Sequence, residues 1–146
     1  EGRQLGKCGC RMDNVKVAVR VRPYNSREKE RDARCIIEMA GGTTSITNPD
    51  TGEVKSFSFD YSYWSHAPGD NFATQKVVFD DLGIGVLENA WQGYNVSLFA
   101  YGQTGSGKSY SMVGYGEDKG IIPCACRELF RRIECNENAD VTYHVQ

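Results

Sequence analysis

The chain has 146 residues, of which 40% are hydrophobic and 25% charged, and its formal net charge is −2. This length predicts one domain at most, and the composition is typical of a globular chain rather than a disordered one. The small net charge gives no basis for a nucleic acid or an anionic membrane surface as partner. No apolar run reaches the length of a membrane span, and no secretory signal pattern opens the chain. We therefore expect a cytoplasmic protein, and we expect no direct membrane contact from this chain.

The first predicted strand follows a polar, glycine-rich opening. We expect residues 1–12 to form a disordered leader. In residues 14–22, NVKVAVRVR, valines alternate strictly with lysine, alanine and arginine side chains. This period of two predicts a strand that Pro23 ends. The charged residues 25–34 then predict a loop or a short helix.

Short β-prone segments come next. Residues 35–39 and 43–47 flank Gly41 and Gly42, and this arrangement predicts a hairpin. Residues 54–64, VKSFSFDYSYW, alternate again and predict a further strand. We expect the hairpin to form a small separate lobe.

The hydrophobic period changes from two to between three and four over residues 71–92. This spacing predicts an amphipathic helix, which Asp70 or Asn71 would cap and a glycine would end. Gly83 and Gly85 lie inside the pattern, and they indicate either close packing or a bend.

A buried strand and two helices complete the predicted elements. Residues 95–101, NVSLFAY, are a short apolar run bounded by glycines, which predicts a buried parallel strand. A short helix should begin near Lys108, and a longer one should cover residues 124–134 with Pro123 in its first turn. Residues 140–146 predict the beginning of another strand.

The six cysteines are expected to be reduced thiols, since no secretory signal is present. Cys8 with Cys10 and Cys124 with Cys126 form C-x-C pairs, which leave a metal site as an alternative. In the simpler interpretation Cys35 and Cys126 are buried as small hydrophobic residues and the other thiols are exposed.

One motif carries chemistry, and it lies between the predicted strand at 95–101 and the helix near Lys108. The sequence GQTGSGKS fits the phosphate-binding pattern G-x-x-x-x-G-K-[ST]. Its glycines let the backbone approach a phosphate, and successive N–H groups form an anion nest. Lys108 would supply positive charge to the β- and γ-phosphates, and the Ser109 hydroxyl would bind Mg²⁺. The predicted nucleotide-binding residues are Gly102, Gln103, Thr104, Gly105, Ser106, Gly107, Lys108 and Ser109.

The alternative to a nucleotide site is a glycine-rich hairpin with an incidental Lys-Ser pair. An unrelated phosphate-loop kinase or GTPase is a third interpretation, but it would require a guanine-reading N-K-x-D motif or a lid, and neither is found in these residues.

Three segments, NSREKERDARCIIEM, TTSITNP and SFSFDYSYWSH, resemble the kinesin-3 class of motors in particular. Four segments together resemble the N-terminal part of a kinesin motor domain. They are VKVAVRVRP, FDYSYWS, GYNVSLFAYGQTGSGKSYSMVG and GIIP. The resemblance covers residues 13–146, which we expect to be the truncated N-terminal part of such a domain. It implies an α/β fold of three layers, the P-loop NTPase fold, with a central, mostly parallel sheet and a small β-lobe near its edge. The strand at 95–101 would be central.

The resemblance also implies further site residues. Arg20, Arg22 and Pro23 match the R-x-R-P segment that borders the adenine in kinesins, although two solvated charges at a strand end are the alternative. Tyr110 matches a position whose ring packs on the base, and a core aromatic behind the loop is its alternative. Lys108 would be the catalytic cation.

The implied activity is microtubule-dependent hydrolysis of Mg-ATP, with ATP or ADP and Mg²⁺ as cofactors. The parent protein would be a cytoplasmic, cytoskeleton-associated motor, plus-end directed and carrying organelles or vesicles. The switch motifs N-x-x-S-S-R and D-x-x-G-S-E are missing from these residues. Microtubules would therefore be bound through regions outside this chain, and cargo or adaptors would be bound through a downstream tail. We expect this chain alone to have no appreciable ATPase activity. A non-motor, nucleotide-binding regulatory module derived from a kinesin is the alternative.

Overall fold

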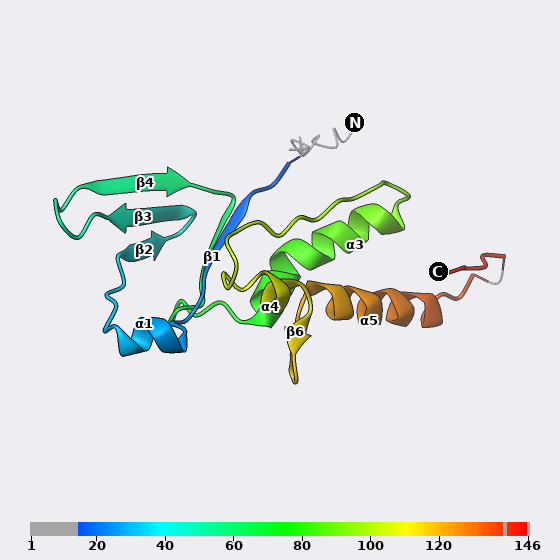
Figure 1. Ribbon diagram of the computed structural model, residues 1–146. Helices are drawn as coiled ribbons and strands as arrows, with labels where there is room; N and C mark the ends of the chain where they lie inside the picture. Colours follow the sequence, from blue (N-terminus) through cyan, green and yellow to red (C-terminus); the bar gives the residue numbers. More distant parts are fainter. Residues whose placement is uncertain (1–14, 139, 146) are drawn as a thin grey trace, which may run out of the picture. The chain divides into compact units, whose positions relative to one another are not determined.

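The computed structural model describes residues 15–138 and 140–145, and these fall into two compact units (Figure 1). Within the described part, the first unit comprises residues 15–20 and 34–62, and the second comprises the rest. The leader predicted over residues 1–12, with Cys8 and Cys10, lies outside the described residues.

The first unit contains a three-stranded antiparallel sheet in the order β2-β3-β4. The strands are β2 (Ile37–Ala40), β3 (Thr43–Thr47) and β4 (Val54–Ser58). The predicted hairpin is confirmed, and Gly41 turns the chain with a φ of +56°. The third strand, β4, extends this hairpin in register, with Ser45 opposite Ser56.

The single strand predicted over residues 54–64 is wrong, because the chain changes partner at Phe59. The Phe59 N–H donates to the Gly42 carbonyl at 2.8 Å, but the next N–H, of Asp60, donates to the Val17 carbonyl at 3.0 Å. The Asp60 carboxylate also accepts from the Val17 N–H at 2.7 Å. Residues after this switch form a separate strand, β5 (Tyr61–Trp64).

Strand β5 pairs with β1 (Ala18–Val21), the strand predicted at the start of the chain. The Tyr61 N–H donates to the Val17 carbonyl, and the Ser65 N–H donates to the Val21 carbonyl. Between these two hydrogen bonds both strands advance four residues in the same direction. This advance makes the pair parallel. The charged stretch that follows β1 forms the short helix α1 (Ser26–Glu30).

The predicted amphipathic helix is confirmed, but it begins later and is interrupted. It consists of α2 (Gln75–Val78), the π-helical segment η1 (Phe79–Gly83) and α3 (Ile84–Trp91). Thr74 caps it by accepting the Val77 N–H, so the predicted caps Asp70 and Asn71 are wrong. The physical reason is that the Ala73 N–H donates to the Trp64 carbonyl at 2.7 Å, which holds the chain before Thr74 extended.

The strand predicted over residues 95–101 is wrong. This segment has no regular secondary structure, and its Phe99 and Tyr101 side chains are 86% and 101% exposed. A strand exists only through hydrogen bonds to a neighbour, and no strand among the described residues pairs with this one. The strand predicted over 140–146 is likewise absent from residues 140–145, where no pairing partner is found.

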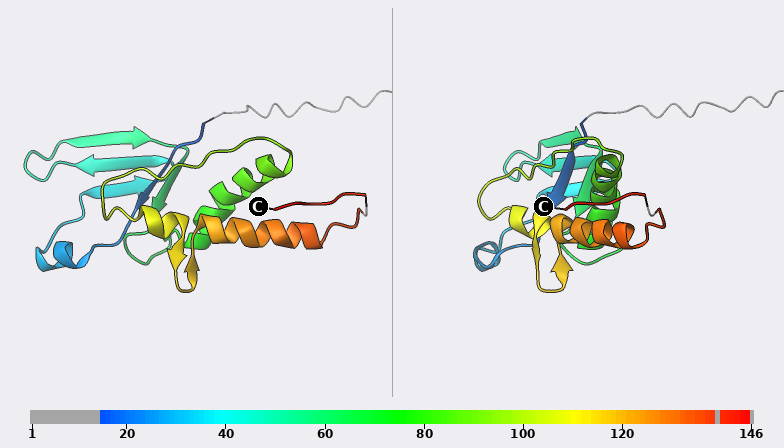
Figure 2. Two further views of the ribbon diagram at one scale, coloured as in Figure 1. Left: turned by 45° about the vertical axis from the view of Figure 1, so that its right-hand side comes forward. Right: turned by 90° about the vertical axis from the view of Figure 1, so that its right-hand side faces the viewer.

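The remaining helices agree with the prediction. The short helix α4 (Lys108–Met112) follows the glycine loop, and a small hairpin of β6 (Gly114–Tyr115) and β7 (Asp118–Lys119) connects it to α5 (Ile121–Glu134). Helix α5 runs alongside η1 and α3 (Figure 2). Arg132 of α5 binds Glu88 of α3 at 2.9 Å and lies over the Trp91 ring.

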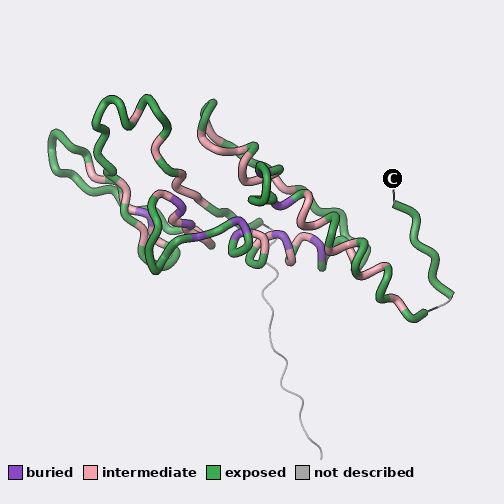
Figure 3. The backbone as a smooth tube through the Cα atoms, turned by 90° about the horizontal axis from the view of Figure 1, so that it is seen from below, coloured by how far each residue is buried: buried purple, intermediate pink, exposed green. Residues whose placement is uncertain are grey.

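Few side chains of the described chain are fully buried, and most of the tube in Figure 3 is exposed or half-buried. The buried hydrophobic residues are Tyr63, Ala73, Val78, Leu87 and Ile121.

None of the four cysteines in the described residues belongs to this small core. Cys35 and Cys126 are exposed, so their predicted burial is wrong. Cys35 precedes an edge strand of a sheet only three strands wide, and Cys126 lies in α5, where Ile121 is the only buried residue. Among the described residues, no group of three or more His, Cys, Asp or Glu side chains could hold a metal ion.

No helix in the described part of the chain combines the length and the apolar character that crossing a membrane requires.

Candidate functional site

The predicted phosphate loop forms a tight turn in the second unit, between the irregular segment and α4. The Ser106 N–H closes the turn by donating to the Gln103 carbonyl at 3.1 Å. Gly105 and Gly107 have φ values of +80° and +93°, a region that only glycine enters without strain. The motif therefore has glycine where the backbone requires it, as the sequence predicted.

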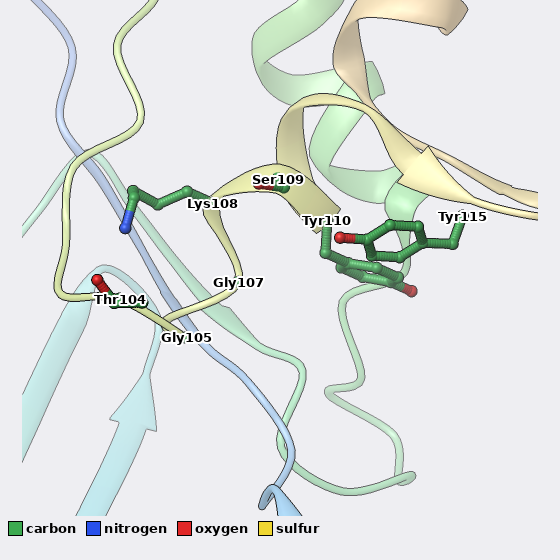
Figure 4. A pocket seen from close by; sticks show the side chains of 7 residues that line it. All are labelled: Thr104, Gly105, Gly107, Lys108, Ser109, Tyr110 and Tyr115. Carbon is green, nitrogen blue, oxygen red and sulfur yellow. The ribbon is translucent and has the colours of Figure 1, made fainter.

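Lys108 is the first residue of α4, and its side chain folds back over the loop (Figure 4). Its Nζ donates to the carbonyls of Gly102 and Gln103, at 2.8 Å each. Both bonds are charge-assisted, so they fix the ammonium group above the loop.

The loop and two tyrosines line a pocket of about 360 Å³, a volume within the usual range for small-molecule sites. The lining residues are Thr104, Gly105, Gly107, Lys108, Ser109, Tyr110 and Tyr115. Five of the eight predicted motif residues line this pocket, whereas Gly102, Gln103 and Ser106 do not. Ser109 is exposed and places a hydroxyl, a hard oxygen donor, in the first turn of α4.

Tyr110 and Tyr115 form the aromatic wall of this pocket. Their ring centroids lie 6.2 Å apart with an interplanar angle of 33°, and Figure 4 shows the two rings next to each other. The Tyr110 hydroxyl donates to the Asp118 carboxylate at 3.2 Å, which ties the ring to the β6–β7 hairpin. Tyr110 was predicted as a site residue, whereas Tyr115 was missed, because only the hairpin turn brings it back to the loop.

Gln75 supports this wall from α2. Its side chain is buried, and Nε2 donates to the Tyr110 carbonyl at 2.6 Å and to the Asp118 carbonyl at 3.3 Å. One amide group therefore joins the end of α4 to the hairpin. Sequence reasoning did not identify this residue, since its partners lie 35 and 43 positions away.

Arg22 also lies against the loop. Its Cβ and Cδ are 3.9 Å from the position that a Cβ on Gly107 would occupy, so the side chain lies beside this glycine. Its guanidinium group points to Glu28, with two contacts of 2.7 Å. The exposed Pro23 follows Arg22 in the second unit, whereas Arg20 lies in β1 within the first unit, and its role remains a prediction.

Comparison with known proteins identifies the family. Residues 20–146 match the sequence model described as kinesin motor domain. The chain belongs to the kinesin motor domain family. The resemblance stated from the sequence is therefore confirmed, including the kinesin-3 class, since KIF1A, KIF1B and KIF1C are 51–56% identical to the chain.

The similar proteins are long motors and solved motor domains. The chain is 56% identical over 145 residues to kinesin-related protein 1 of Dictyostelium discoideum, covering 89% of the chain and 7% of that protein. It is 56% identical over 139 residues to kinesin-like protein KIF1A of Rattus norvegicus, covering 91% and 8%. A structure of KIF14 with ADP in complex with a microtubule superimposes with a TM-score of 0.83 at 44% identity, covering 89% of this chain and 36% of that one.

These matches confirm the predicted α/β fold class of a kinesin motor domain. They also show that the chain spans less than a tenth of the length of these two curated relatives and about a third of the solved motor chain.

Proposed function

We propose that this chain provides the nucleotide-binding part of a microtubule motor that hydrolyses Mg-ATP. The observation that carries the proposal is the phosphate loop, with Lys108 held over it and Ser109 beside the same pocket. Membership of the kinesin motor domain family supports ATP as the nucleotide, and the KIF14 structures that resemble the chain contain ADP or AMP-PNP.

The residues of the loop fit a polyphosphate and its metal ion. The loop N–H groups and the Lys108 ammonium would bind phosphate oxygens and stabilise the negative charge that develops on them during transfer to water. The Ser109 hydroxyl would hold Mg²⁺, which would neutralise negative charge on the phosphates. We propose Lys108 as the catalytic residue of this chain on that basis.

The base would lie against the aromatic wall and the segment that follows β1. Tyr110 offers a ring for stacking, and Arg22 offers a flank beside Gly107, with Pro23 following it in the sequence. Arg20 belongs to the same R-x-R-P segment, and we include it in the proposal. Tyr115, which lines the pocket beside Tyr110, joins the list of proposed base-contacting residues.

Microtubules are the proposed partner, since the similar KIF14 structures are complexes with microtubules. We propose a location on the cytoskeleton in the cytoplasm, plus-end directed movement of organelles or vesicles, and attachment of cargo or adaptors through other parts of the protein. A nucleotide-binding module without motor activity would bind ADP equally well but would not bind microtubules in a nucleotide-dependent way.

The direct test is a titration of the protein with fluorescent Mg-ADP, with Lys108→Ala as the variant. Loss of a charge-assisted contact to phosphate should weaken binding by about 10- to 100-fold. Lys76→Ala is the matched control, because Lys76 of α2 binds Asp80 of η1 and lies outside the pocket. Equal affinity of the Lys108→Ala variant and the unmodified protein would refute the proposed site.

A further inference from the structure

Glu28 lies outside the phosphate loop, yet its carboxylate is the centre of a compact set of contacts. Its two oxygens accept from the two terminal nitrogens of Arg22, at 2.7 Å each. Oε2 also accepts the backbone N–H of Asn25 at 2.8 Å, and the Asn25 side chain accepts the Glu28 N–H at 2.9 Å. The second pair of contacts is a capping box, which fixes the start of α1.

The backbone between Arg22 and Asn25 is held from a second side by His66. The His66 Nδ1 lies 3.0 Å from the Arg22 carbonyl oxygen, and the ring of Tyr24 meets the His66 ring edge-on with centroids 4.4 Å apart. The Arg22 guanidinium group also donates to the Pro23 carbonyl at 2.7 Å. Both the side chain and the backbone of this short segment are therefore constrained.

The constrained side chain leads directly to the phosphate loop. Between its backbone and the guanidinium group, the hydrocarbon part of Arg22 lies 3.9 Å from the Cβ position of Gly107, the residue before Lys108. A bidentate pair fixes the guanidinium plane as well as its distance. The position of Arg22 beside the loop thus depends on where Glu28 holds the far end of the arginine.

We propose that Glu28 is a positioning residue for the nucleotide, acting through Arg22. Glu28 neutralises the guanidinium charge and orients the arginine side chain. Arg22 and Pro23 would then contact the base of the nucleotide through their hydrocarbon surface, and Arg22 would not act as a phosphate-binding cation. This inference rests on the proposed nucleotide site and adds a residue that lies five positions beyond the end of the R-x-R-P segment.

The charge state of the pair agrees with a fixed role. The pKa of Glu28 is lowered to about 2, chiefly by the hydrogen bonds from Arg22 and then by the Asn25 backbone N–H, while the pKa of Arg22 is raised by Glu28. His66, the other ionisable group that faces the segment, favours the same charged form of Glu28. The pair therefore stays charged across the neutral pH range and does not act as a switch.

The test compares two probes, Mg-ADP and magnesium pyrophosphate, by titration calorimetry on the Glu28→Gln variant. Glutamine keeps the size of the side chain but loses the charge and one acceptor. We expect ADP affinity to fall by about five- to tenfold and pyrophosphate affinity to stay within about twofold, since only ADP carries a base. Glu128→Gln is the control: Glu128 also accepts from two arginines and also has a pKa of about 2, but it lies in α5, outside the pocket.

A second measurement tests whether Glu28 acts through Arg22. If it does, Glu28→Gln should cause no further loss of ADP affinity once Arg22→Ala is present. Equal loss of both probes, or full additivity with Arg22→Ala, would overturn the inference, and so would an unchanged ADP affinity. Those results would leave the nucleotide site in place, whereas failure of the unmodified protein to bind either probe would refute the proposed function and this inference with it.

Discussion

Gly83 provides the sharpest test of the packing around the π-helical segment. It is buried at the end of η1 with helical backbone angles, φ −66° and ψ −40°, so alanine would meet no backbone strain there. A Cβ at this position would lie 2.5 Å from Cε2 and 3.1 Å from Cγ of Phe79. Carbon atoms normally approach to about 3.5–4.0 Å, so the Phe79 ring would have to move.

The size of the effect follows from comparison with Gly85, two residues later. A Cβ on Gly85 meets nothing within 4 Å, and Gly85 also lies within the helix. Alanine should gain about 1 kcal/mol over glycine at both sites from helix propensity. The steric overlap at Gly83 should cost about 1–3 kcal/mol, as overpacking does in other cores. Because the propensity gain is shared, we expect Gly83→Ala to be less stable than Gly85→Ala by about 1–3 kcal/mol.

Thermal unfolding followed by circular dichroism at 222 nm measures this difference. For a chain of this length, 1 kcal/mol corresponds to roughly 4 °C in Tm. The Gly83→Ala variant should therefore melt several degrees below the Gly85→Ala variant, which should melt at or above the unmodified protein. If Gly83→Ala is as stable as Gly85→Ala, the Phe79 ring does not pack against Gly83 and the reasoning is refuted.

Two further predictions concern polar contacts. Gln75→Ala should lower the free energy of unfolding by about 1–3 kcal/mol, because it leaves the carbonyls of Tyr110 and Asp118 without this donor; a denaturant midpoint equal to that of the unmodified protein would contradict the bridging role. The pKa of Glu128 is lowered from 4.5 to about 2, first by the hydrogen bond from Arg131 and then by that from Arg132. Its stabilising effect should be fully present above pH 4.5 and lost as the pH falls toward 2. The Tm difference between the unmodified protein and Glu128→Gln should shrink over that range, and a constant difference down to pH 2 would argue against the assignment.

Local sequence determined the chemistry of this protein. Gly105 and Gly107 have the left-handed backbone that the phosphate motif requires, and Lys108 begins the helix that the motif predicts. The capping pattern of Asn25 and Glu28 is also local, since three residues separate them, and it was readable from the sequence although it was not recognised. Such features form between neighbours along the chain, so the order of residues is sufficient to specify them.

Tertiary structure decided the pairing of strands and the composition of the pocket wall. The apolar run 95–101 looks like a strand, but no partner among the described residues hydrogen-bonds to it. Residues 54–64 divide because Asp60 meets Val17, and Tyr115 reaches Tyr110 only because the β6–β7 hairpin turns back. In each case the outcome depends on a hydrogen bond or contact with a distant residue or an adjoining turn. Alternation and hydrophobicity indicate that a segment can form a strand, but the partner strand is determined only by the folded chain.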